Sequence, residues 1–252
     1  MFGKQKVAMI VAEFFGTAVL ASVALAMLER TTFPLFLGVA MGTAYTAFWF
    51  MFGKSSGAQF NPVLTVAMWT LRKIQTTQAL VYIVAQALGG LVAWRLAEFL
   101  QRSTLSNISG KNFDWRILIA EAIGTMIFSM GVAAATYNQD DDLKKTITVA
   151  GSLLLGVSVA AFASNGLLNP AVAIGVRSFS WSYSVGPLVG ALVGMNLYVW
   201  LFGPSKHSVR VSASASSTKS APAKKKPATR GRRTTTRRAT STTRRTTTRR
   251  RA

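Results

Sequence analysis

A glutamate and an Asn-Pro motif, both unusual inside apolar segments, each occur twice in this chain, and the spacing between the two copies is the same. Glu13 and Glu121 are 108 residues apart, and so are the tripeptides Asn61-Pro62-Val63 and Asn169-Pro170-Ala171. An ionisable residue in an apolar span is costly, which makes it a candidate for a functional role. An asparagine amide can donate to a polar solute. Acids and Asn-Pro breaks that repeat at one offset indicate a duplicated membrane unit, and such repeats point to a transport pathway.

Each Asn-Pro pair begins a short apolar run that can form a helix but cannot span a bilayer. The runs are Pro62–Leu71 and Pro170–Phe179. Proline suits the first turn of a helix, and asparagine is a favoured N-cap. Two such half-helices, entering from opposite faces, would direct their positive N-terminal ends and two amides at one lumen. That field would repel protons and cations and let neutral molecules pass. The alternative is that both motifs are ordinary loop turns.

Six apolar stretches approach or reach the length of roughly 20 residues that crosses a bilayer as a helix. They are Val7–Leu28, Phe33–Phe52, Ala79–Leu96, Ile117–Tyr137, Ile147–Ala163 and Tyr183–Phe202. The first is too long for the apolar core of a signal peptide and contains Glu13, so we interpret it as a retained span. Six spans place both termini on one side, and we expect that side to be the cytoplasm, chiefly because of the basic C-terminal segment.

Charge divides the chain into a predicted channel domain, residues 1–204, and a predicted disordered tail, residues 205–252. The tail contains 16 of the 29 Lys and Arg residues and no acid, so its charge is +16 of the total +21. It also lacks aromatic residues and cannot bury a core. Such a segment can bind anionic lipid at about 1 kcal/mol per basic residue, or nucleic acid through phosphates. A solvated tail without a specific partner is the remaining alternative.

The sequence contains no arrangement of residues typical of an enzyme, and we expect no catalysis, cofactor or metal site. There is no cysteine, and the single histidine is His207 in the tail. The acidic run Asp140-Asp141-Asp142 lies in a hydrophilic connector. We interpret it as solvated and able to pair with Lys144, Lys145 or the tail.

Four segments resemble one known family. The run Ser56–Thr65 (SGAQFNPVLT) is similar to the first signature of the major intrinsic proteins, the aquaporins and aquaglyceroporins, and Asn169-Pro170-Ala171 resembles the second. Ala85–Gly90 is similar to the small-residue packing segment of the third span, and Val185–Gly190 resembles the start of the last. The resemblance covers about residues 5–203, with repeats of about 5–105 and 113–203.

This resemblance implies an all-α membrane fold of six tilted helices plus two re-entrant half-helices in an inverted repeat. It further implies a homotetramer with one pore per subunit, which passes water or small uncharged solutes such as glycerol. Glu13 and Glu121 would then be buried acceptors that hold the backbone of the re-entrant loops. The chain departs from the first signature at Gln59, where the family usually has histidine, and at Val63, where it has alanine.

A larger departure concerns the selectivity filter. The family usually has arginine three residues after the second asparagine, and this chain has Val172. The other filter positions correspond by spacing to Met41, Val157 and Gly166. We therefore expect an apolar filter without a fixed cation, through which glycerol-sized solutes pass and water passes modestly or comparably. Arg177 is a poor substitute, because five residues rotate a helix by about 140° and advance it by about 7.5 Å.

Two other classes of function are compatible with parts of this pattern. One is a membrane-anchored tether whose basic tail recruits nucleic acid or anionic surfaces, with a vestigial channel. The other is an ion-coupled secondary transporter, since those proteins also use repeats and broken helices. A transporter would be expected to carry more intramembrane acids along its pathway.

Overall fold

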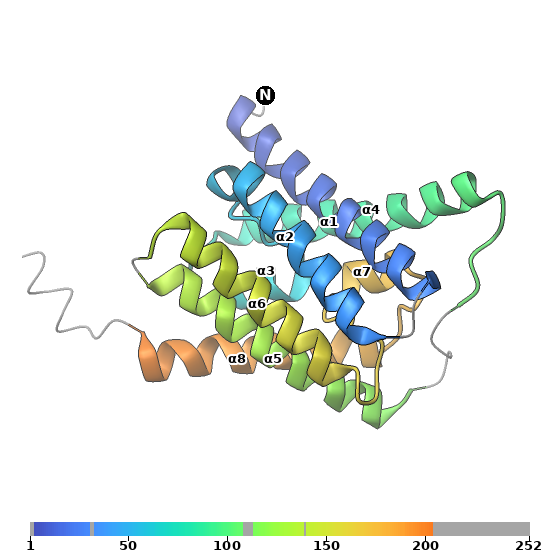
Figure 1. Cartoon of the computed structure of the whole chain (residues 1–252). Helices are drawn as coiled ribbons and strands as arrows, with labels where there is room; N and C mark the ends of the chain where they lie inside the picture. Colours follow the sequence, from blue (N-terminus) through green and yellow to red (C-terminus); the bar gives the residue numbers. More distant parts are fainter. Residues whose placement is uncertain (1–2, 31–32, 108–112, 139, 204–252) are drawn as a thin grey trace, which may run out of the picture. The chain divides into compact units, whose positions relative to one another are not determined.

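The computed structural model describes residues 3–30, 33–107, 113–138 and 140–203, and every regular element in these ranges is an α-helix (Figure 1). The helices are α1 (Lys4–Arg30), α2 (Pro34–Ser56), α3 (Pro62–Thr70), α4 (Thr76–Gln101), α5 (Trp115–Tyr137), α6 (Asp142–Ala160), α7 (Pro170–Gly175) and α8 (Ser182–Phe202). Among the described residues, six helices are long and apolar enough to cross a membrane, which confirms the six predicted spans. The predicted tail lies outside the described residues.

The duplication in the sequence is visible in the packing of the helices. In the first half α1 packs against α4, and in the second half the equivalent helices α5 and α8 pack against each other (Figure 1). The two halves meet along α2 and α6. Each short helix crosses to the other half, so that α3 lies against α8 and α7 lies against α4. Interlocked halves of this kind are the arrangement that an inverted repeat predicts.

Small residues allow α7 to lie in direct backbone contact with α4. A Cβ atom on Gly90 of α4 would collide with the carbonyl oxygen of Ala171. A Cβ atom on Gly175 of α7 would lie 3.1 Å from the carbonyl oxygen of Gly90. Helices in membranes commonly use small residues to approach this closely. The start of α7, and with it the second Asn-Pro motif, is therefore fixed by its contact with α4.

The short helix α7 ends at Gly175, before the predicted Phe179. The amide of Ser178 donates to the carbonyl oxygen of Ala173 at 2.8 Å, and Arg177 adopts a φ of +54°. A left-handed residue just after the last turn is a common way to end a helix. The prediction was too long because the left-handed position is occupied by Arg177, a residue type that does not mark such a turn.

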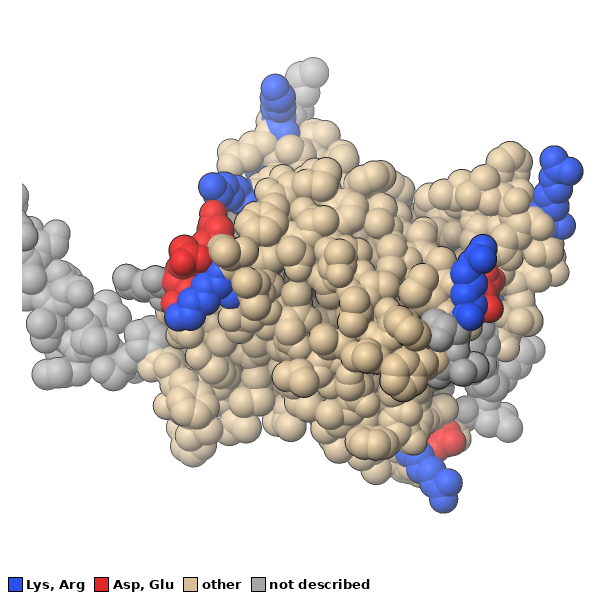
Figure 2. Space-filling view, viewed as in Figure 1, with Lys and Arg blue, Asp and Glu red and all other residues tan. Residues whose placement is uncertain are grey.

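Exposed charged side chains of the described residues lie near the ends of the long helices and leave an uncharged zone on the surface between them. Figure 2 shows Lys, Arg, Asp and Glu around the margins of this face, with a broad zone of other residues between them. Exposed leucine, valine and phenylalanine side chains are common along the six long helices. An apolar outer surface of this extent is what a lipid bilayer solvates. The chain is an integral membrane protein that crosses the bilayer several times.

The acidic run before α6 is paired at the surface. Asp140 forms an ion pair with Lys144 at 2.6 Å, as predicted, and Asp142 pairs with Lys54 of α2 at 3.4 Å. Asp141 caps α6 by accepting from the amide of Lys144 at 2.8 Å. Exposed pairs of this kind contribute about 0–1 kcal/mol, so the Lys54–Asp142 pair connects α2 and α6 only weakly.

Candidate functional site

The loops that lead into α3 and α7 have the same unusual backbone. Ala58 and Phe60 have φ values of +49° and +50°, and the residues 108 positions later, Gly166 and Leu168, have values of +63° and +53°. For residues other than glycine this conformation costs of the order of 1–3 kcal/mol each, and it persists only where the surroundings enforce it. Each loop therefore needs partners that hold it in place.

Glu13 supplies these partners for the first loop. Its side chain is fully buried. Oε1 accepts from the backbone N–H of Gln59 at 3.0 Å, and Oε2 accepts from that of Phe60 at 2.7 Å. Oε2 also accepts from Nε2 of Gln86 on α4 at 2.8 Å. One carboxylate thus satisfies two buried backbone donors and ties the loop to α1 and α4.

Glu121 makes the corresponding bonds in the second half. It too is fully buried. Oε1 accepts from the N–H of Leu167 at 3.0 Å, and Oε2 accepts from that of Leu168 at 2.7 Å. The hydroxyl of Ser164 donates to Oε1 at 2.7 Å. The two loops are therefore held by the same device at the same distances.

Each asparagine caps the short helix that follows it. Oδ1 of Asn61 accepts from the N–H of Val63 at 3.1 Å. Oδ1 of Asn169 accepts from the N–H of Ala171 at 3.0 Å and from that of Val172 at 3.4 Å. Proline occupies the first helical position in both cases. The side-chain carbonyl oxygen of each asparagine thus accepts within the helix that it caps. The side-chain NH₂ group of each asparagine remains available to other partners.

The amide groups of the two asparagines join the two loops. Nδ2 of Asn61 donates to the carbonyl oxygen of Leu168 at 2.9 Å, and Nδ2 of Asn169 donates to that of Phe60 at 2.8 Å. The structure therefore brings the two Asn-Pro motifs face to face, as predicted for opposed half-helices. Each NH₂ group has two hydrogens. One is used in this reciprocal bond, and a second hydrogen remains on each nitrogen.

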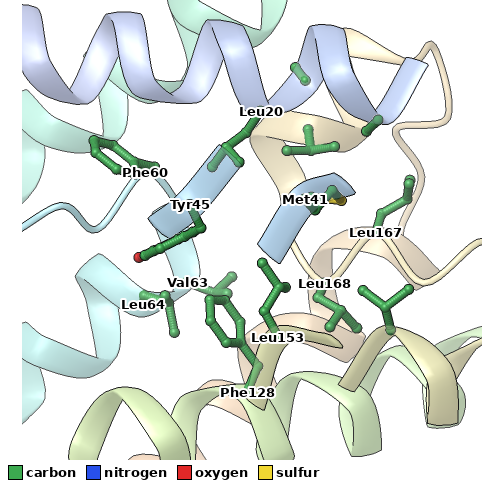
Figure 3. Close-up of a cluster of buried hydrophobic side chains, with 14 of the residues drawn as sticks. Leu20, Met41, Tyr45, Phe60, Val63, Leu64, Phe128, Leu153, Leu167 and Leu168 are labelled. Carbon is green, nitrogen blue, oxygen red and sulfur yellow. The ribbon is translucent and has the colours of Figure 1, made fainter. Parts of the chain in front are cut away.

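A small cavity lies where the two motifs meet. It gives the centre of a water molecule about 10 Å³ to move in, which is close to the minimum that holds one water. Its walls are formed by Leu20, Met41, Tyr45, Asn61, Phe128, Leu153, Leu167, Leu168 and Asn169. Figure 3 shows how the side chains of Leu20, Met41 and Leu153 converge from three helices on this region. All lining residues other than Asn61, Asn169 and Tyr45 have apolar side chains.

The four predicted filter residues are all buried and carry no charge. Met41 lies in the wall of the central cavity, and Val157, Gly166 and Val172 are buried outside its lining. Gly166 packs against Val157, since a Cβ atom on Gly166 would lie 3.0 Å from the Val157 carbonyl oxygen. The structure thus brings Gly166 and Val157 together and places Met41 at the level of the asparagines.

Arg177 is engaged away from these residues. Its guanidinium donates to the carbonyl oxygen of Leu105 and lies 4.9 Å from the centre of the Trp94 ring on α4. These contacts tie the end of α7 to α4 and to the segment that follows it. They agree with the prediction that Arg177 does not replace the arginine missing at Val172.

Sequence reasoning did not identify several residues of the site. Leu20 and Phe128, and likewise Tyr45 and Leu153, are pairs that line the cavity. Both pairs are 108 residues apart, so the offset that revealed the asparagines could have identified them. The residue 108 positions after Gln86, which supports Glu13, is a glycine, so the repeat did not identify Gln86.

Comparisons with known proteins agree with this geometry. The family model of the major intrinsic proteins matches residues 3–198. The chain is 32% identical to "Glycerol uptake facilitator protein-like 6" of Lactiplantibacillus plantarum, over 72% of this chain and 92% of that protein. It is 29% identical to "Aquaporin NIP1-1" of Zea mays, over 84% of this chain and 80% of that protein.

A solved structure has the same fold. The X-ray structure of the aquaglyceroporin from Plasmodium falciparum superimposes with a TM-score of 0.61 at 20% sequence identity, over 82% of this chain and 99% of that one. Two capped half-helices and two buried acids repeat at one offset among six spans, and the family model covers all of these elements except the last residues of the sixth span. The chain therefore belongs to the major intrinsic protein family.

Proposed function

We propose that this chain is a passive membrane channel for water and small uncharged solutes, and that glycerol-sized molecules pass at least as readily as water. The observation that carries the proposal is the cavity where Asn61 and Asn169 meet at the N-terminal ends of α3 and α7. Two opposed helix ends produce a positive field that disfavours cations. The remaining amide hydrogens can donate to an oxygen of a neutral solute.

The preference for partly apolar solutes follows from the proposed filter, formed by Met41, Val157, Gly166 and Val172. None of these side chains has an ionisable group or a hydroxyl. Water loses hydrogen bonds when it enters such a ring, whereas a molecule with CH groups loses fewer. The name of the relative from Lactiplantibacillus plantarum, a glycerol uptake facilitator-like protein, supports glycerol as the first solute to test.

In this proposal Glu13 and Glu121 support the loops and do not contact the solute. Both carboxylates are fully buried, and both oxygens of each accept from backbone N–H groups. Neither residue lies in the lining of the central cavity. A carboxylate engaged in this way has little capacity left for a passing molecule.

The proposal extends to orientation, assembly and the tail. An even number of spans places both termini on one side, and the 16 basic residues beyond residue 204 favour the cytoplasm. We propose a homotetramer with one pore per subunit, as in the family. For residues 205–252 we propose binding to anionic lipid, with nucleic acid as the alternative.

The test is stopped-flow light scattering of proteoliposomes in gradients of water, glycerol, urea and ammonia. Full-length protein and a chain shortened to residues 1–204 are compared with protein-free vesicles. We expect both proteins to raise glycerol and water permeability equally. Vesicles that stay as impermeable as the protein-free control would contradict the channel. That result together with tail-dependent binding to nucleic acid or anionic vesicles would favour the tether.

A further inference from the structure

Tyr45 of α2 has an unusual position in the wall of the central cavity. The side chain is 2% exposed, and its hydroxyl donates towards two backbone carbonyl oxygens of the first loop, those of Ala58 at 2.5 Å and Gln59 at 3.1 Å. The ring contacts Phe60 and Phe128 edge to face, at centroid distances of 5.5 and 5.8 Å. In Figure 3 the ring of Tyr45 extends from α2 towards the first loop, beside Phe60 and Val63. Its rotamer is therefore held by packing on both sides.

The two carbonyl oxygens belong to the loop that leads directly to Asn61. Irregular backbone at membrane depth is tolerated where it is buried in protein or lines an aqueous path. Ala58 and Gln59 are not part of the cavity lining itself, so their carbonyl groups can accept from a solute only beyond the cavity, on the side of the first loop. The Tyr45 hydroxyl shares its single hydrogen between these two acceptors, so a solute must compete with it for part of their accepting capacity. A molecule such as water then finds fewer acceptors in the protein to replace the hydrogen bonds that it made to bulk water.

The second half of the molecule differs at this point. The position 108 residues after Tyr45 is Leu153, which also lines the cavity but has no hydroxyl. The loops themselves are alike, with the same backbone conformation and the same carboxylate support. The difference between Tyr45 and Leu153 therefore makes the two sides of the cavity chemically unequal.

We propose that Tyr45 is a specificity-determining residue, whose hydroxyl competes with the solute for the carbonyl acceptors of Ala58 and Gln59 and thereby lowers the permeability to water more than that to glycerol. The proposal rests on the proposed channel function. It assigns selectivity to the first-loop side of the cavity in addition to the apolar filter. Solutes with apolar CH groups need fewer of these acceptors, so the hydroxyl penalises them less.

The variant Tyr45→Phe tests this assignment because it removes only the hydroxyl and keeps the ring between Phe60 and Phe128. The matched control is Tyr82→Phe. Tyr82 is also buried, and its hydroxyl donates to the carbonyl oxygen of Ser56 at 2.9 Å, but it does not line the cavity. Both substitutions delete a buried hydroxyl that donates to backbone carbonyl oxygen, so a general effect of that loss appears in both.

Water and glycerol permeabilities are measured in proteoliposomes and normalised to the reconstituted protein. For Tyr45→Phe we expect water permeability to rise about two- to tenfold, the factor that corresponds to the net value of one hydrogen bond, and the glycerol-to-water ratio to fall. Tyr82→Phe should match wild type. A second variant, Tyr45→Leu, copies the residue of the second half, and it should raise both permeabilities because it also removes the ring.

An unchanged or reduced water permeability in Tyr45→Phe, or the same rise in Tyr82→Phe, would overturn the assignment and leave the channel function intact. If Tyr45→Phe is poorly folded, an unchanged glycerol-to-water ratio in Tyr45→Leu overturns it instead. A wild-type protein without measurable water permeability, together with a Tyr45→Phe variant that conducts water, supports the assignment. If wild type and every variant are silent, the proposed channel function fails and this inference fails with it.

Discussion

The buried acids give the sharpest test of how the two loops are held. In Glu13→Leu, the backbone N–H groups of Gln59 and Phe60 lose their acceptor without access to bulk water. Each stranded donor costs about 1–3 kcal/mol, so the two together lower the free energy of unfolding by about 2–6 kcal/mol. Glu13→Gln keeps one acceptor oxygen and strands at most one of the two donors, which costs about 1–3 kcal/mol. The same order is expected for Leu and Gln at Glu121.

The measurement is thermal unfolding of purified protein in detergent, followed by intrinsic fluorescence and by recovery on size exclusion. Glu29→Leu is the matched control on the same helix, since Glu29 is exposed and accepts from the exposed Gln101 amide at 2.8 Å. We expect the highest unfolding temperature for Glu29→Leu, a lower one for Glu13→Gln and the lowest for Glu13→Leu. Folded Glu13→Gln should still conduct, because the acid does not line the cavity.

Two results would refute this reasoning. One is equal tolerance of glutamine and leucine at both Glu13 and Glu121, which would mean that the carboxylates do not support the loops. The other is a Glu13→Gln protein that is as stable as wild type but has lost solute flux, which would assign the acid to the pathway.

Three further predictions concern the pore and the tail. Asn61→Asp and Asn169→Asp each place a negative charge at two positive helix ends and remove the donor to the opposed loop, so cation leak should rise and solute flux should change; ion conductance and solute flux like those of wild type in inserted protein would contradict this. Val172→Arg adds a fixed cation and donors at the proposed filter and should lower the glycerol-to-water permeability ratio; an unchanged ratio in matched proteoliposomes would locate the filter elsewhere. Residues 205–252 should bind anionic vesicles with an affinity that falls as salt is raised; binding that is independent of salt in a sedimentation assay would exclude an electrostatic role.

Much of the fold follows from the sequence because its strongest signals are local or repeated. Six long apolar runs require spanning helices, since a bilayer leaves few other structures. The Asn-Pro pairs predict where α3 and α7 begin, because capping and the first-turn proline are local effects. The end of α7 was missed, because the left-handed Arg177 that terminates it is not a residue type that favours this conformation.

The site was only partly predictable, because its wall depends on how helices are rotated in the bundle. The offset of 108 paired the asparagines and the acids without any knowledge of packing. It did not show that Tyr45 would reach the carbonyl groups of the first loop, or that Gln86 would reach Glu13 from α4. Those contacts arise from helix crossings that close glycine packing sets, and single-residue patterns do not encode them.

The central claim is that neutral solute moves passively between the two asparagines, and the dependence of glycerol flux on its gradient tests it most directly. Initial rates are measured in proteoliposomes over a wide range of glycerol gradients, with and without an opposed proton or sodium gradient. The proposed channel predicts rates proportional to the glycerol gradient, zero net flux without it, and no response to the ion gradients. Saturable uptake, or accumulation of glycerol against its own gradient when ions flow, would contradict a channel and indicate a coupled transporter.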